Sequence, residues 1–189
     1  DLYGYNGRDF SRFWDKVCSV PEWKEYAIET DRLGSLAAKL FNSRHPNKPK
    51  TFLHLMRQFR HCPDFRKSLT PYIQTAIEIS GEMADSFFEA ARPFPEWRSA
   101  VSADCIVDIV RKLGSSPDME YLVGVYASSL AGIIQSCKGR ATTAWRKALV
   151  GSGAISDFLG ADHNRLFTDK VRNALRGDTI YETAFRRYL

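Results

Sequence analysis

The chain has 189 residues, is 44% hydrophobic and 13% aromatic, and carries a formal net charge of +5. These apolar side chains suffice for a core, which excludes an intrinsically disordered chain, and the length suits one domain or a short repeat array. The longest apolar run, residues 122–134, is interrupted by Gly124, Ser128 and Gly132. It falls short of the ~20 residues that span a bilayer, so no membrane partner is expected.

The four cysteines are widely spaced, at Cys18, Cys62, Cys105 and Cys137. Such sparse spacing does not suit a disulfide scaffold, so we expect reduced cysteines that serve as small apolar side chains. Residues 1–20 lack the apolar run of a signal peptide, and the chain begins at Asp1 rather than at Met. We therefore expect an intracellular location, cytoplasmic or nuclear, and a chain excised from a longer protein.

Helix starts are marked by prolines suited to a first turn and by capping Ser, Thr and Asp residues. In chain order these signals are Pro21, Thr70-Pro71, Pro95, Ser116-Pro117, Asp162 and Asp178. Glycines that suit helix ends are Gly114, Gly139, Gly160 and Gly177.

Between these marks, apolar residues recur at intervals of three and four, which is the pattern of amphipathic helices. The main stripes contain Phe10, Phe13, Trp14 and Val17; Phe52, Leu55, Met56 and Phe59; Ile73, Ile77, Gly81, Ala84 and Phe88; Ala100, Ala103, Ile106, Val110 and Leu113; Ile155, Phe158 and Leu159; and Leu166, Val171, Ala174 and Leu175. We expect core positions for most of the tryptophans Trp14, Trp23 and Trp97, whereas an exposed one would be an interface anchor. The sequence predicts an all-α fold of about nine helices and no sheet.

Predicted helix starts fall near residues 51, 71, 95, 117, 141 and 162, which are 20 to 24 residues apart. Pairs of helices therefore repeat every 44 to 46 residues. A helical-pair period of about 40–47 residues is typical of armadillo and HEAT arrays. We therefore expect one helical domain over 1–189, with N-terminal helices and a basic loop in 1–50 and a right-handed stack of helical pairs in 51–189. The alternative is an irregular helical bundle, because helices of ordinary length with short loops give a similar spacing.

Residues 148–159, ALVGSGAISDFL, resemble the armadillo element in which a small-residue turn opens the helix that faces the groove. The resemblance implies an armadillo-like shape. Armadillo proteins that hold extended peptides use an asparagine ladder on groove-lining helices, whereas asparagine occurs here only at 6, 42, 47, 164 and 173. The family's peptide-binding mode is therefore not implied.

No catalytic or metal-binding motif is visible. His54, His61 and Cys62 fall near one helix end and could bind a metal together with a distant ligand such as Cys18, but zinc sites usually contain close ligand pairs that are missing here. Cys105 is flanked by Asp104 and by apolar residues, an environment that would raise the pKa of its thiol. Cys137, next to basic residues, is the better candidate for a reactive thiol, although a structural role is favoured.

Carboxylates recur at helical spacing in Glu78/Glu82, Asp85/Glu89 and Asp104/Asp108. None belongs to a Glu-x-x-His motif, so an acidic solvated face is favoured over a di-metal site. Residues 151–154 lack the Gly-Lys-Ser/Thr ending of a phosphate-binding loop. We therefore expect no catalytic residue, no metal and no cofactor, and a chain that is not an enzyme.

Charge is unevenly distributed. Residues 31–70 carry +7, residues 71–110 carry −5 and residues 111–150 carry +4. Basic residues with a nearby tryptophan suit phosphate contacts and base stacking, although a solvated face or a counterpart for the acidic residues 71–110 is the alternative. The candidate partner-binding residues are Arg44, Lys48, Lys50, Arg57, Arg60, Arg66, Lys67, Lys138, Arg140, Trp145 and Arg146.

These features predict a protein–protein interaction or scaffold domain of a larger intracellular protein or complex. Nucleic-acid binding through the basic residues is the alternative, and an enzyme without a recognisable motif comes third. A homodimer is possible, because Trp and Phe side chains could form a dimer face. Reversing the charge of Arg57 and Arg60 is expected to weaken partner binding without unfolding the domain.

Overall fold

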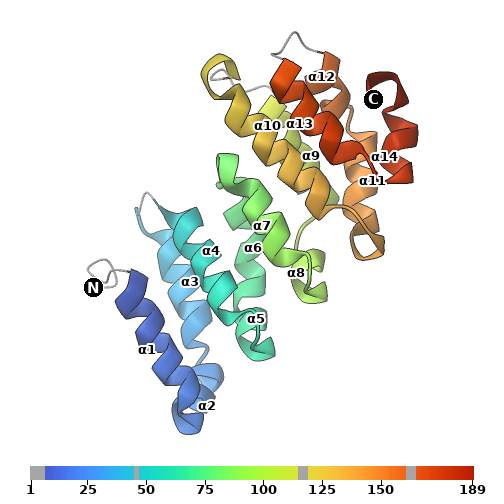
Figure 1. Cartoon of the computed structure of the whole chain (residues 1–189). Helices are drawn as coiled ribbons and strands as arrows, with labels where there is room; N and C mark the ends of the chain where they lie inside the picture. Colours follow the sequence, from blue (N-terminus) through green and yellow to red (C-terminus); the bar gives the residue numbers. More distant parts are fainter. Residues whose placement is uncertain (1–6, 45–46, 115–118, 161–164) are drawn as a thin grey trace. The chain divides into compact units, whose positions relative to one another are not determined.

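A computed structural model describes residues 7–44, 47–114, 119–160 and 165–189 (Figure 1). Side chains are described from residue 12 onward, apart from 45–46, 114–122 and 161–164. Every regular element in this part of the chain is a helix, and it contains no strand. The all-α prediction is therefore confirmed. None of the described helices is long and apolar enough to cross a bilayer.

Packing divides the chain into two compact units, Asp1–Tyr72 (unit 1) and Ile73–Leu189 (unit 2). Two packed halves of one domain and two separate domains would both give this grouping. The expectation of a single domain over 1–189 therefore stays a prediction, and each unit is described by itself.

Unit 1 contains α1 (Gly7–Ser19), α2 (Pro21–Glu29), α3 (Arg32–Asn42), α4 (Lys48–Phe59), α5 (Pro63–Leu69) and the 3-10 turn η1 (Thr70–Tyr72). Its core is built on α4, whose predicted stripe of Phe52, Leu55, Met56 and Phe59 is buried in full. Helix α3 packs on α4 and α5 and adds Leu33, Ala37 and Leu40 to this core.

An aromatic cluster joins α1 to α4 and α5. The Trp14 indole meets the rings of Phe59 and Phe65 edge to face, with centroid distances of 5.1 and 5.9 Å. Phe59 and Phe65 are themselves 5.2 Å apart. Edge-to-face geometry of this kind stabilises beyond simple burial, so the cluster fixes where α1 lies.

Unit 2 contains α6 (Ile73–Glu78), η2 (Gly81–Met83), α7 (Ala84–Ala91), α8 (Pro95–Ser99), α9 (Ala103–Gly114), α10 (Met119–Ser136), η3 (Arg140–Thr142), α11 (Thr143–Gly151), α12 (Ala154–Gly160), α13 (Arg165–Leu175), α14 (Thr179–Ala184) and η4 (Arg186–Tyr188). The long helix α10 packs against α13, α7 and α9, while α9 also contacts α11, α12 and α6. Gly132 permits the approach of α10 to α7, because an added Cβ would lie 2.7 Å from Asp85 Cβ. Helices from both ends of the unit therefore share one core.

A buried ion pair ties α14 to α11. Arg146 Nη1 donates to Asp178 Oδ2 over 2.5 Å, and the two side chains are only 11% and 8% exposed. The other Asp178 oxygen caps α14 by accepting from the backbone N–H groups of Ile180 and Tyr181. The N-cap role predicted for Asp178 is confirmed.

The expected count of about nine helices is wrong, because the described residues alone form more helices than that, several expected helices being divided. Gly81 adopts φ +55 and separates α6 from α7 within one predicted stripe. The start predicted at Thr70-Pro71 is a 3-10 turn that joins α5 to α6, and the Thr70 hydroxyl donates to the Arg66 carbonyl instead of capping a helix. Starts at Pro21 and Pro95 are confirmed, whereas Ser116-Pro117 and Asp162 lie outside the described residues.

Three large apolar residues depart from the expected burial. Phe13 and Leu166 belong to predicted stripes, yet their side chains are exposed, and so is that of Trp23. Trp14 and Trp97 are buried as expected. Two of the three departures, Phe13 and Trp23, lie in unit 1 and line the same surface groove.

Candidate functional site

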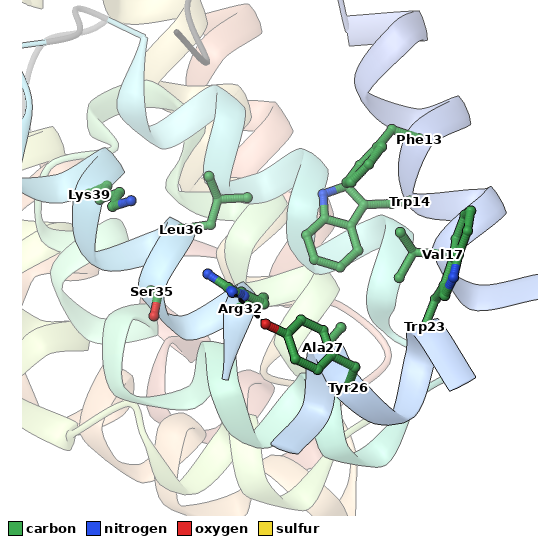
Figure 2. Close-up of a pocket in the computed structure, with 10 residues that line it drawn as sticks. All are labelled: Phe13, Trp14, Val17, Trp23, Tyr26, Ala27, Arg32, Ser35, Leu36 and Lys39. Carbon is green, nitrogen blue, oxygen red and sulfur yellow. Dashed lines mark hydrogen bonds between the residues drawn. The ribbon is translucent and has the colours of Figure 1, made fainter. Parts of the chain in front are cut away.

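A groove of about 580 Å³ opens between α1, α2 and α3 of unit 1. The described side chains that line it are Phe13, Trp14, Val17, Trp23, Tyr26, Ala27, Arg32, Ser35, Leu36 and Lys39. Figure 2 shows Leu36 and Lys39 of α3 on one side and Phe13 and Val17 of α1 on the other. Volumes of about 300–1,000 Å³ with largely apolar walls are typical of binding pockets.

Tight connections between the three helices form the groove. Pro21 at the first turn of α2 directly follows α1. Asp31 then turns the chain with a left-handed φ of 43°, and its carboxylate accepts from the Gly34 N–H over 3.2 Å at the start of α3. A side chain at position 34 would collide with that carboxylate, so the cap requires glycine. The cap therefore sets the direction in which α3 leaves α2.

The groove has a buried floor and an exposed aromatic rim. Trp14, Val17 and Ala27 form the floor and are at most 7% exposed. Phe13, Tyr26 and Trp23 form the rim and are 59%, 54% and 51% exposed. Large aromatic side chains that stay half in water beside an apolar floor are the side chains that an interface buries most favourably.

Two cations, Arg32 and Lys39, lie in the groove seven residues apart on α3. Arg32 Nη2 donates to the Tyr26 hydroxyl over 2.9 Å, and its guanidinium carbon lies 5.4 Å from the centre of the Tyr26 ring. Neither cation forms an ion pair with a carboxylate of the described residues. The described lining contains no acidic side chain, so the groove favours an anionic ligand.

The net charge of the chain belongs to unit 1. Residues 1–72 hold 13 Lys and Arg against eight Asp and Glu, whereas residues 73–189 hold 14 of each. The formal charge of +5 is thus the charge of the unit that contains the groove. Any long-range effect of the net charge therefore acts on unit 1.

Seven of the predicted partner-binding residues also lie in unit 1. Arg44, Lys50, Arg57, Arg60 and Lys67 are exposed. Lys48 and Arg66 are half-buried, and they donate to the backbone carbonyls of Phe41 and Arg60 over 2.8 and 2.6 Å. None of the seven is among the described residues that line the groove.

The four predicted residues of unit 2 are placed differently. Trp145 is 3% exposed and packs edge to face on Phe88, with centroids 5.3 Å apart, so its ring is not available for stacking on a ligand. Arg146 is held in the ion pair with Asp178. Lys138 Nζ donates to the Arg176 carbonyl over 2.7 Å, while Arg140 is exposed.

The suggested metal ligands do not assemble in the described part of the chain, where no group of three His, Cys, Asp or Glu residues could hold an ion. His61 Nε2 accepts from Arg60 Nε over 3.0 Å. Cys18 does interact electrostatically with Cys62: burial raises the pKa of the Cys18 thiol, and Cys62 raises it further. Both cysteines are reduced.

A second, polar pocket of about 290 Å³ lies in unit 2 and brings together Glu78, Asp104 and Asp108 beside Cys105. Burial raises the pKa of the Cys105 thiol to about 11, and the charges of Glu78 and Asp108 add to that rise. The predicted direction of this pKa shift is confirmed. Burial likewise raises the pKa of Cys137, although Arg92 and Arg146 oppose it. Neither thiol is poised as a nucleophile, because each stays protonated near neutral pH.

No protein-family model, curated protein or solved structure matches the chain. The groove of unit 1 is therefore interpreted from its own chemistry.

Sequence reasoning missed three residues of that groove, Phe13, Trp23 and Tyr26. The signal for the last two was present: Trp23 and Tyr26 share one face of α2 at a spacing of three, between the charged residues of Glu-Trp-Lys-Glu-Tyr. Only Ala27 of α2 is buried, so this short helix presents its aromatic side chains to solvent.

Proposed function

We propose that the chain is a non-catalytic protein–protein interaction module and that it docks its partner through the groove between α1, α2 and α3. The observation that carries the proposal is the convergence of Phe13, Trp23 and Tyr26, all about half exposed, on one apolar floor. Interfaces concentrate their binding energy in Trp, Tyr and Arg side chains, and Trp23, Tyr26 and Arg32 supply all three.

The exposed apolar residues of unit 2 support this choice by contrast. In the described part of unit 2, the exposed large apolar residues are Ile79, Val125, Leu166, Ile180 and Leu189, and none of them is aromatic. Exposed aliphatic side chains are ordinary on a protein surface, whereas a contiguous patch of exposed aromatic side chains marks an interaction site.

The armadillo/HEAT-like shape is part of the same proposal. Residues 148–159 form the end of α11 and most of α12, joined by a turn in which Gly153 adopts φ +72. A helix, a small-residue turn and a second helix is the local arrangement that the resemblance implies. This local likeness supports a scaffold role within a larger intracellular assembly.

Nucleic acid is the second candidate ligand, because Arg44, Lys50, Arg57, Arg60 and Lys67 are all exposed on unit 1. Phosphate contacts of this kind weaken steeply as salt rises. None of these residues is among the described residues that line the groove, so variants can separate the two ligand classes.

We expect the Trp23→Ala/Tyr26→Ala variant to lose bound proteins in a pull-down from native lysate. Truncating an aromatic side chain at an interface hot spot costs at least about 2 kcal/mol of binding free energy. Wild type, this variant and Ile79→Ala serve as baits, each with and without nuclease and at two salt concentrations. Ile79→Ala is the matched control, since it also truncates an exposed apolar side chain.

Proteins that survive nuclease, are retained by Ile79→Ala and are lost by the groove variant support docking through the groove. The same proteins retained equally by all three baits would contradict it. A fourth bait, Arg57→Glu/Arg60→Glu, tests the alternative. Material that disappears with nuclease, and that this fourth bait fails to recover, would identify nucleic acid as the ligand instead.

A further inference from the structure

We propose that the partner of the groove is a second copy of this chain, which inserts α2 of each protomer into the groove of the other. The inference rests on the proposed function, and it names the occupant of the same site. It follows from two stripes of opposite charge, the acidic stripe Glu22 and Glu29 on α2 and the basic stripe Arg32 and Lys39 on α3.

The exposed surface of α2 has the chemistry that the groove selects. At 3.6 residues per turn, Trp23, Tyr26, Glu22 and Glu29 follow one another around the helix from its core side to solvent. All four are exposed. Neither Glu22 nor Glu29 pairs with a cation of the described residues. This surface is therefore an aromatic edge bordered by free carboxylates.

The two stripes match in length. Glu22 and Glu29 are seven residues apart, as are Arg32 and Lys39. Seven residues of α-helix span about 10.5 Å, so two carboxylates on one helix can meet two cations on another in a single alignment. The aromatic edge of α2 would then lie on the apolar floor that α1 and α2 of the partner provide.

In a dimer with a two-fold axis, the acidic stripe of each protomer faces the basic stripe of the other. In an isologous dimer, a surface that carries both stripes is complementary to itself, because α2 of each protomer meets α3 of the other. Four oppositely charged pairs would then border a centre of aromatic side chains. This arrangement, an apolar centre with a charged rim, is the usual anatomy of a protein interface.

Another acidic segment of the chain, formed by η2 and α7, fits less well. Glu82 and Glu89 in unit 2 are also seven residues apart and exposed. The apolar residues between them, Ala84, Phe87 and Phe88, are buried in the core of unit 2, so no aromatic edge accompanies these carboxylates. Of these two segments, only α2 combines paired carboxylates with an exposed aromatic edge.

The test is sedimentation equilibrium of the whole chain and two charge-reversed variants, Glu22→Lys/Glu29→Lys and Arg32→Glu/Lys39→Glu. Wild type should dimerise, with a dissociation constant that rises with salt. Each variant alone should dimerise at least tenfold more weakly, because like charges face each other across the interface. An equimolar mixture of the two variants should recover the dimer, since every contact then joins opposite charges again.

The matched control is Lys147→Glu/Arg176→Glu, which makes the same change in net charge at two exposed cations of unit 2 that lie outside the groove. It should dimerise as wild type does. Circular dichroism of each variant checks folding, and Lys39→Glu alone serves where Arg32→Glu disturbs Tyr26.

A monomeric wild type at the highest soluble concentration, or a mixture no tighter than the separate variants, would overturn the dimer. The proposed docking function fails on a different result, the insensitivity of captured proteins to Trp23→Ala/Tyr26→Ala. A monomer whose protein capture still depends on the groove leaves that function intact with a different occupant.

Discussion

Replacing Arg146 with alanine is expected to lower the free energy of unfolding of unit 2 by about 3–5 kcal/mol, the usual cost of breaking a buried ion pair. The reason is the isolation of Asp178, whose side chain is 8% exposed and would keep a buried charge without its cation. Urea unfolding followed by circular dichroism measures the loss.

The control for this variant is Arg165→Ala, which removes a cation that lies 3.9 Å from Asp169 and is 91% exposed. Exposed ion pairs contribute less than about 1 kcal/mol, so this change should be nearly silent. Equal losses for Arg146→Ala and Arg165→Ala would contradict a stabilising role of the buried pair.

The loss should also depend on pH. Burial alone would raise the pKa of the Asp178 carboxyl, but hydrogen bonds from Arg146 and from the Tyr181 N–H, with the Arg146 charge, lower it below its ordinary 3.8. A depressed pKa stabilises the fold above the unfolded value and loses that contribution as the pH falls through the folded value. The stability difference between wild type and Arg146→Ala should therefore be constant above about pH 5 and shrink below pH 4.

Replacing Phe65 with alanine is expected to destabilise unit 1 by about 3–5 kcal/mol. The Phe65 ring is fully buried and meets Trp14 and Phe59 edge to face. Its removal leaves a cavity beneath Trp14, which forms part of the groove floor. Groove-dependent binding should therefore fall together with stability, although Phe65 lies outside the groove.

Phe13→Ala is the matched control, because it makes the same truncation at the exposed edge of the same cluster, where Phe13 meets Trp14 at 5.6 Å. With 59% of Phe13 already exposed, a stability loss below about 1 kcal/mol is expected. Equal losses in the free energy of unfolding for Phe65→Ala and Phe13→Ala, measured by urea unfolding, would contradict a role of the cluster in anchoring α1.

Local signals predicted helices better than they predicted surfaces. Pro21, Pro95 and Asp178 mark starts because their effect depends on the first turn alone. The division at Gly81 was missed, since a period of three and four continues across a break that only the backbone angle reveals. Phe13 was assigned to the core because periodicity shows which residues share a helix face, not whether another helix covers that face.

The groove itself could be predicted only in part. The basic character of residues 31–70 is visible in the sequence, and it includes Arg32 and Lys39. Their approach to the aromatic side chains of α1 and α2 depends on the turn at Asp31, which is a tertiary feature. The Arg146–Asp178 pair joins residues 32 positions apart, and no local pattern indicates such a pairing.

The most direct test of docking through the groove is photo-crosslinking from Leu36, which α3 directs into the groove (Figure 2). The photoreactive amino acid p-benzoylphenylalanine replaces Leu36 in one protein and Ile79 in another, and both are irradiated in native lysate. We predict a discrete protein adduct, to a second copy or to another protein, from position 36 and none from position 79. Equal labelling from both positions, or no adduct from position 36, would contradict a docking role for the groove.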